Sequence, residues 1–136
     1  MKPHILLRIA AVLAALFAAG HTAGAPWTPA KGMLETALVN SMKSLHFDVM
    51  GSQRTYFDFY FGFGVAIAVY LFTLAIVLWQ VAELSKVDAK PLRPIMATLF
   101  VSYVGGGVVT AMYFFAPPLA LSAAVCLFIA LAWAKA

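Results

Sequence analysis

The residues best suited to chemistry are clustered in one stretch, LHFDVMGSQRTYFDFYFGFG, which runs from Leu45 to Gly64. It holds a histidine, two aspartates and an arginine among aromatic side chains, and another histidine lies upstream. Such groups could hydrogen-bond the polar head of a small molecule whose apolar part lies against the rings. We therefore take as candidate ligand-binding residues His21, His46, Asp48, Arg54, Asp58 and Tyr60.

The second half of this stretch also fits the start of a membrane helix. Thr55 and Asp58 match the [ST]-x-x-[DE] capping pattern directly ahead of an apolar run, and the helix dipole favours a carboxylate in the first turn. If the helix began at Ser52 instead, Arg54 and Asp58 would lie four residues apart and could pair. The tyrosines fit an interfacial aromatic belt or the wall of a lipophilic pocket. A functional carboxylate at the membrane boundary is the alternative for Asp58.

Metal, haem and nucleophilic chemistry have weaker support in the sequence. His21, His46 and a carboxylate could ligate a metal ion or haem, but their spacing matches no known ligand pattern. No Ser-His-Asp or Cys-His set is recognisable. Cys126 lies in an apolar run, where a free cysteine usually packs as a small hydrophobic residue. We expect no catalytic residue, no metal and no cofactor.

The composition indicates a membrane protein. Of the 136 residues, 64% are hydrophobic and 10% are charged, whereas soluble domains have about 45–50% apolar and about 25% charged residues. The net charge of +4 comes from Lys and Arg residues that lie mainly between the apolar runs. These positions are typical of topology determinants, so we expect no nucleic-acid partner.

Four apolar runs approach the roughly 20 residues that a spanning helix needs. They predict an all-α fold, a bundle of four transmembrane helices that forms a single membrane domain. The expected spans are about 5–25, 57–82, 94–116 and 118–134, with an outer connection at 26–56. The first run also has the outline of a signal peptide ending in Ala23-Gly24-Ala25. Pro26 would follow that cut, where proline is poorly tolerated, so we expect the run to remain as a helix.

The outer connection contains a helical pattern of its own. Apolar residues recur at Leu34, Leu38, Met42 and Leu45. This spacing predicts an amphipathic helix over about residues 32–45 that lies on the outer surface of the bilayer or caps the bundle.

The distribution of Lys and Arg predicts the orientation. With the N-terminus inside, the inner segments carry Lys2, Arg8, Lys86, Lys90, Arg93 and Lys135, and the outer ones carry Lys31, Lys43 and Arg54. Both termini are then cytoplasmic, in a multi-pass protein of the bacterial inner membrane. The inner connection from Glu83 to Arg93 is expected to be a solvated loop whose basic residues touch anionic lipid heads. No charged residue lies at mid-span, which disfavours a proton-coupled antiporter.

Small residues supply the expected packing surfaces. The first span has alanines at every fourth position, and the third has the triplet from Gly105 to Gly107 beside Ser102 and Thr110. Apolar attraction between helices is weak in lipid, so close approach through small residues must supply the packing. The triplet could instead be a flexible point or the thin wall of a pocket.

Two resemblances extend this interpretation. The segments GHTAG, from Gly20 to Gly24, and MKSLHFDVMGSQRTYFDFYFGFG, from Met42 to Gly64, resemble a family of small bacterial four-helix integral membrane proteins without an assigned function. The resembling positions are Gly20, His21, Thr22, Phe47, Asp48, Gly51, Arg54, Asp58, Tyr60, Gly62 and Gly64. More distantly, the architecture is similar to the group of DoxX-like, sterol-isomerase and sigma-2-receptor proteins. This likeness implies a lipophilic or amine ligand held by acidic side chains. The chain lacks acids at mid-helix, so the implied function is an analogy.

Three functions follow as hypotheses. The first is a non-enzymatic protein that binds a small lipophilic molecule or lipid near the outer leaflet, with His21, Arg54 and Asp58 at the mouth of the pocket. The second is an accessory or scaffold subunit of a larger membrane complex, or a homo-oligomer. The third is a membrane enzyme that acts on a lipophilic substrate.

Overall fold

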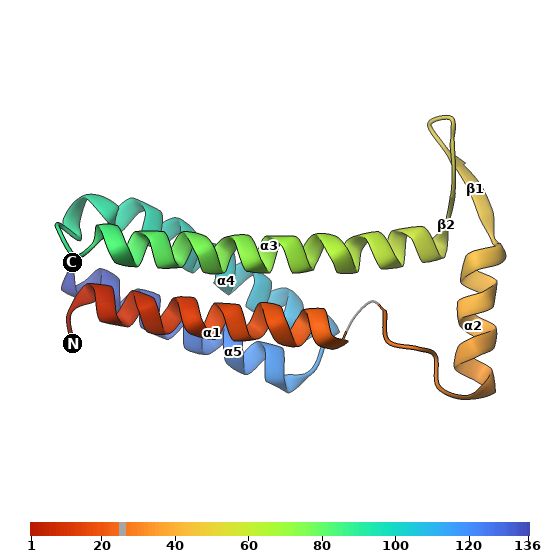
Figure 1. Ribbon diagram of the computed structural model, residues 1–136, viewed down its shortest axis with the longest axis horizontal. Helices are drawn as coiled ribbons and strands as arrows, with labels where there is room; N and C mark the ends of the chain where they lie inside the picture. Colours follow the sequence, from red (N-terminus) through yellow and green to blue (C-terminus); the bar gives the residue numbers. More distant parts are fainter. Residues whose placement is uncertain (25–26) are drawn as a thin grey trace. The chain divides into compact units, whose positions relative to one another are not determined.

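The computed structural model describes residues 1–24 and 27–136 (Figure 1). This described part of the chain is almost entirely helical, as the sequence predicted. Its elements are α1 (Pro3–Gly24), α2 (Gly32–Ser44), β1 (His46–Val49), β2 (Ser52–Thr55), α3 (Tyr56–Leu84), the 3-10 turn η1 (Lys90–Leu92), α4 (Arg93–Tyr113) and α5 (Ala116–Lys135).

Among the described residues, four helices are long and apolar enough to cross a membrane, which confirms the expectation of a multi-pass membrane protein. They are α1, α3, α4 together with η1, and α5. Each begins and ends within four residues of the bounds expected from the sequence. Ala25, where the first span was expected to end, and Pro26, where the outer connection was expected to begin, lie outside the described residues.

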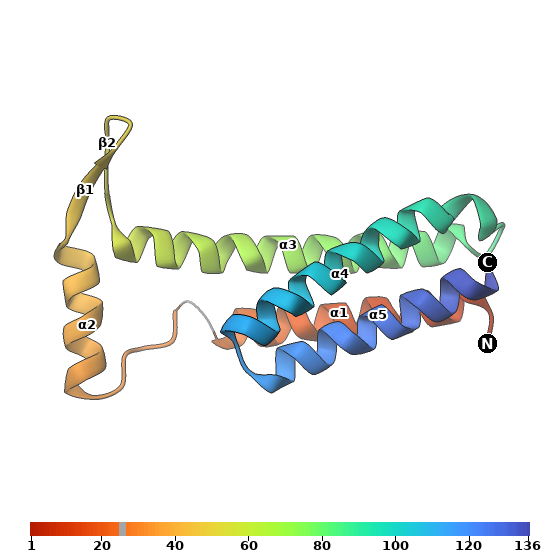
Figure 2. The ribbon, with the colours of Figure 1, turned by 180° about the vertical axis from the view of Figure 1, so that it is seen from behind.

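Prolines mark the starts of α4 and α5. Pro94 and Pro117 lie in the first turns of these helices, where the missing N–H would have no helical partner in any case. The two helices are joined by Phe114 and Phe115, whose extended backbone ends one helix and starts the next. This short link makes α4 and α5 an antiparallel hairpin, which lies nearest to the viewer in Figure 2.

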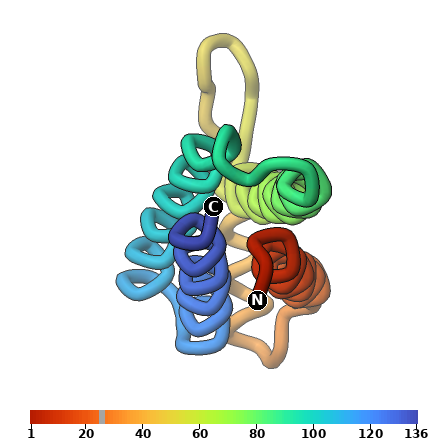
Figure 3. Tube along the Cα trace, turned by 90° about the vertical axis from the view of Figure 1, so that its left-hand side faces the viewer, coloured from red at the N-terminus to blue at the C-terminus, as the bar shows by residue number. Residues whose placement is uncertain are grey.

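The chain divides into two compact units, which are described separately. Unit 1 comprises Met1–Ala19 and Tyr70–Ala136, and unit 2 comprises Gly20–Val69. In unit 1, parts of α1 and α3 lie beside α4 and α5, and both termini lie at the same end as the α3–α4 connection (Figures 1 and 3). The residues of its core are Leu6, Leu7, Ala10, Ala11, Ala14, Ala75, Leu78, Val81, Ala82, Met96, Leu99, Tyr103, Val125, Ile129 and Ala132.

Buried alanines lie where the helices of unit 1 contact one another. Ala10 and Ala14 of α1 and Ala82 of α3 are fully buried, as is Ala132 of α5. Side chains this small let helix backbones approach closely, which is the main source of helix association in lipid. The alanine stripe expected on the first span is therefore used inside unit 1.

Unit 2 contains a β-hairpin between α2 and α3 that the sequence analysis did not predict. Strands β1 and β2 are antiparallel, with His46 opposite Thr55 and Val49 opposite Ser52. The two residues between them both have positive φ, 52° at Met50 and 82° at Gly51. This is the backbone of a type I′ turn, whose twist suits a two-residue hairpin, and glycine adopts it without a side-chain clash.

The capping pattern at the start of α3 is confirmed. The Thr55 N–H donates to Asp58 Oδ2 at 2.8 Å, and the Asp58 N–H donates to Thr55 Oγ1 at 3.1 Å. The helix therefore begins at Tyr56, and the earlier start at Ser52 is wrong. Arg54 belongs to β2, where its Nη1 donates to the Gln53 carbonyl at 2.8 Å. The expected four-residue pairing of Arg54 with Asp58 on one helix does not form, because the strand turns the arginine off that helix.

The reciprocal cap can be tested by Thr55→Val, which keeps the shape of the side chain and removes the hydroxyl. We expect the amides of the first turn of α3 to exchange hydrogen about fivefold faster, the effect of losing one capping acceptor. Hydrogen exchange of the full chain in detergent, read by mass spectrometry, measures this. Thr36→Val is the matched control, because the Thr36 hydroxyl donates to the Gly32 carbonyl of its own helix and caps no helix. If Thr55→Val and Thr36→Val gave the same exchange rates in the first turn of α3, the capping role of the Thr55 hydroxyl would be contradicted.

Candidate functional site

The predicted ligand-binding residues all lie in unit 2, where most of them have local structural partners. His21 Nε2 lies 2.9 Å from the Gly64 carbonyl oxygen. A carbonyl only accepts, so Nε2 must carry a proton. This bond links the end of α1 to the first half of α3.

His46 and Asp48 shape the hairpin. His46 Nδ1 lies 2.9 Å from the Ser44 carbonyl oxygen at the end of α2. Asp48 Oδ1 accepts the Gly51 N–H at 3.0 Å, inside the two-residue turn. Side-chain bonds of this kind stabilise tight turns. Among residues 1–24 and 27–136, no group of three or more His, Cys, Asp or Glu side chains is placed to hold a metal ion.

Aromatic rings surround the beginning of α3. The Phe47 ring of β1 lies 4.9 Å from the Tyr56 ring and 5.7 Å from the Phe59 ring, measured between centroids. Tyr60 is half exposed, and its ring lies 6.1 Å from that of Phe57. These contacts hold the hairpin on the helix. None of the six predicted residues lines the groove of the α4–α5 hairpin, and none lines the hollow beside α2 formed by Gly32, Met33, Thr36, Ala37 and Asn40.

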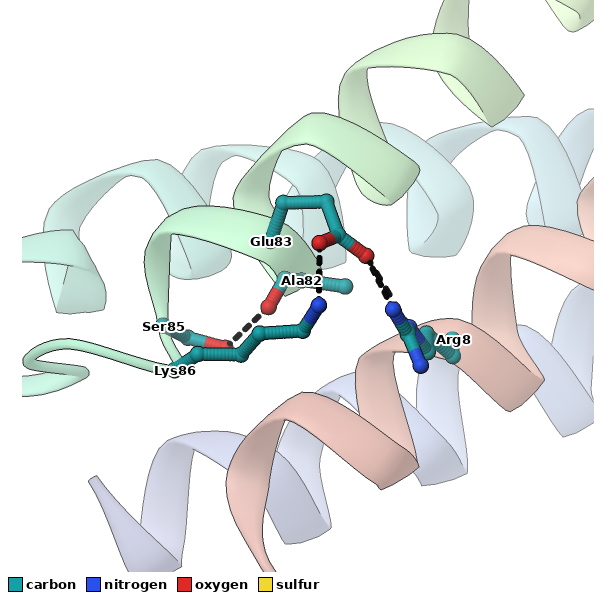
Figure 4. A network of polar contacts seen from close by, with 5 residues as sticks. All are labelled: Arg8, Ala82, Glu83, Ser85 and Lys86. Carbon is teal, nitrogen blue, oxygen red and sulfur yellow. Dashed lines mark hydrogen bonds and ion pairs between the residues drawn. The ribbon is translucent and has the colours of Figure 1, made fainter.

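A polar network in unit 1 was missed by the sequence analysis (Figure 4). Arg8 of α1 pairs with Glu83 of α3, with Nε 3.1 Å from Oε1, and Lys86 pairs with the other carboxylate oxygen. Glu83 is therefore not part of a solvated loop: α3 continues to Leu84, since no residue before it breaks the helix. The signal in the sequence was the placement of Arg8 and Glu83 at the same end of adjacent spans.

An apolar groove runs along the α4–α5 hairpin in unit 1. It has a volume of about 200 Å³ and opens at the surface of the unit. It follows the first half of α4 and the last half of α5, at the end away from the link between them. The lining residues are Met96, Ala97, Phe100, Val101, Ile129, Ala130 and Trp133.

A basic side chain lies at the end of this groove. The Arg93 guanidinium carbon lies 4.1 Å from the centroid of the Trp133 ring, within cation–π range. Its Nε is buried, and no described residue accepts a hydrogen bond from it. No described carboxylate forms an ion pair with Arg93, whereas Arg8, which lies 5.3 Å over the Trp79 ring, is paired with Glu83.

The Arg8–Glu83 pair is open to a direct test. Both side chains are 39% exposed, so we expect a modest effect from Glu83→Gln, because solvent screens such pairs. The variant should unfold at a lower temperature in detergent, and the loss should shrink when Arg8→Gln is already present. Asp88→Asn is the control, because the Asp88 carboxylate accepts the Lys90 backbone N–H and forms no ion pair with another described residue. If the losses in unfolding temperature of Glu83→Gln and Arg8→Gln simply add in the double variant, Arg8 and Glu83 do not interact.

The comparisons with known proteins do not indicate a function, so the function is inferred from the geometry of the site. No protein-family model matches the chain, and neither a curated protein nor a solved structure does. The resemblance to small bacterial four-helix membrane proteins therefore remains an expectation. The α4–α5 groove with Arg93 and Trp133 is the candidate site that unit 1 presents.

Proposed function

We propose that the chain is a non-enzymatic membrane protein that binds a lipophilic molecule in the groove of the α4–α5 hairpin. The observation that carries this proposal is the apolar hollow between Phe100 of α4 and Trp133 of α5. The lining contains no acid, base or nucleophile, so it favours binding over catalysis.

The dimensions of the groove favour a narrow ligand. Pockets for drug-sized molecules usually have about 300–1,000 Å³, and this groove has about 200 Å³. It is also open along the surface of the unit, on a face that a bilayer would cover. A single acyl chain or a similar linear hydrocarbon fits such a space better than a ring system does.

The proposed site differs from the one expected at the outer leaflet. Arg93 and Trp133 lie at the end of unit 1 that also carries both termini. If the termini are cytoplasmic, as the positive-inside rule predicts, the ligand enters from the inner leaflet of the bacterial inner membrane. The helix α2 then lies outside, where Leu34 and Leu38, both exposed, would rest on the outer surface of the bilayer.

Filling the groove should remove binding. Ala130→Phe places a ring in the hollow, whereas Ala123→Phe makes the same change two turns away on the same face of α5, where the residue is also exposed. With a trace of a lipid bearing a photoactivatable acyl chain in vesicles, we expect labelling at 96–101 and 129–133 to fall about tenfold in Ala130→Phe only. Peptide mass spectrometry locates the label.

Two outcomes of the same labelling experiment would contradict the proposed function. If the wild-type label is spread evenly over all exposed apolar faces, such as those at Val108 and Leu127, no lipid is held preferentially. If Ala130→Phe leaves the labelling of the groove unchanged, the proposed function fails.

An accessory role is the second candidate, because two glycines of α4 have no neighbour. A Cβ at Gly105 or Gly106 would meet no atom within 4 Å, whereas one at Gly107 would lie 3.8 Å from Ser122 Cβ. Each glycine costs a helix about 1 kcal/mol relative to alanine. Packing against α5 accounts for only one of the three, so the other two suit a helix from a second copy of the chain.

Association through this face can be measured by disulfide trapping in membranes. In a Cys126→Ala chain, Gly106→Cys should oxidise to a species of twice the mass. Val104→Cys, which lies on the opposite side of α4 and is also exposed, should remain at the mass of one chain. Equal trapping at both positions, or none at Gly106→Cys, would contradict this role.

A further inference from the structure

We propose that Arg93 binds the phosphate of an anionic phospholipid whose acyl chain occupies the α4–α5 groove. This inference rests on the proposed function and adds the class of ligand and the residue that selects it. It is supported by the unpaired Nε of Arg93, by the position of the groove beside Trp133 and by the basic residues at this end of unit 1.

Arg93 has a buried donor, its Nε, that no described residue uses. Its guanidinium carbon lies 4.1 Å from the Trp133 centroid, and its buried Nε has no acceptor among the described residues. A buried donor without a partner costs free energy, so such a group usually serves a partner from outside the chain. The guanidinium is a planar fork that matches two phosphate oxygens at once.

Arg8 shows what an arginine in unit 1 does when its role is structural. It also lies over a tryptophan, with its guanidinium carbon 5.3 Å from the Trp79 centroid, but its charge is met by Glu83. The nearest acids in sequence to Arg93 are engaged elsewhere: Glu83 pairs with Arg8 and Lys86, and Asp88 accepts the Lys90 N–H. Arg93 is thus left to bind an anion.

The surroundings favour a lipid phosphate as that anion. Trp133 belongs both to the cation–π contact and to the lining of the groove, so the guanidinium lies where the hollow begins. A phospholipid carries its phosphate at the end of its acyl chains, which matches a basic group at the mouth of an apolar groove. Besides the paired Arg8, this end of unit 1 carries four lysines, which are Lys2, Lys86, Lys90 and Lys135. Such clusters attract anionic membrane surfaces.

The selectivity of the site tests the proposal. The full chain is placed in vesicles of phosphatidylcholine and phosphatidylglycerol, with a trace of either lipid bearing a photoactivatable acyl chain. In the wild type, we expect the anionic probe to label the groove about tenfold more than the zwitterionic probe, as a charge-assisted bidentate contact would give. In Arg93→Gln the two probes should label equally, and Arg93→Lys should retain part of the preference.

Controls separate this inference from its alternatives. Lys90→Gln removes one positive charge from the same end and should leave most of the preference, whereas equal losses at Lys90 and Arg93 would indicate only general attraction to an anionic surface. Inorganic phosphate at millimolar concentration should not displace the anionic probe, and displacement would indicate a phosphate site without a lipid.

The role of Arg93 and the lipid-binding role of the groove can fail separately in these experiments. If Arg93→Gln keeps the full preference while Ala130→Phe abolishes labelling, the groove binds a lipid and Arg93 does not select it. If Ala130→Phe changes nothing, both proposals fail. Circular dichroism and thermal unfolding of each variant in the same vesicles confirm that the chain is folded.

Discussion

Helices in a bilayer gain little from hiding apolar side chains from lipid, so the helices of unit 1 depend on how closely their backbones approach. The fully buried alanines provide this approach, at Ala10 and Ala14 of α1, Ala82 of α3 and Ala132 of α5. Larger residues fill the space between them, among them Leu7, Leu78 and Met96. The groove exists beside this core because Ala97 and Ala130 repeat the same small side chain where no further helix of unit 1 covers it.

A charged side chain near hydrocarbon has to be neutralised by a partner or has to reach water. The two half-buried arginines of unit 1 differ in this respect. Arg8 has a tryptophan face and a carboxylate, and Arg93 has a tryptophan face alone. An arginine that needs a counterion and has none among the described residues can take it from the headgroup region of the membrane. Because of this difference, we assign a structural role to Arg8 and propose a ligand for Arg93.

The helices and their starts could be predicted because they depend on local sequence. Apolar runs predict spans, and the reciprocal bonds between Thr55 and Asp58 follow from a pattern four residues long. The hairpin was missed because its turn places Met50 at positive φ, a conformation that methionine rarely adopts. The Arg8–Glu83 pair and the Arg93–Trp133 contact depend on how each helix is rotated against its neighbour. That rotation is set by packing, which a single sequence does not reveal.

Non-denaturing mass spectrometry of the chain extracted from membranes in mild detergent tests the central claim most directly. The account predicts one phospholipid with an anionic headgroup retained per chain. It also predicts that the lipid is absent from Ala130→Phe and that a mixture of lipid classes replaces it in Arg93→Gln. A wild-type chain that carries no lipid, or one that carries lipids in proportion to their abundance in the membrane, would contradict it.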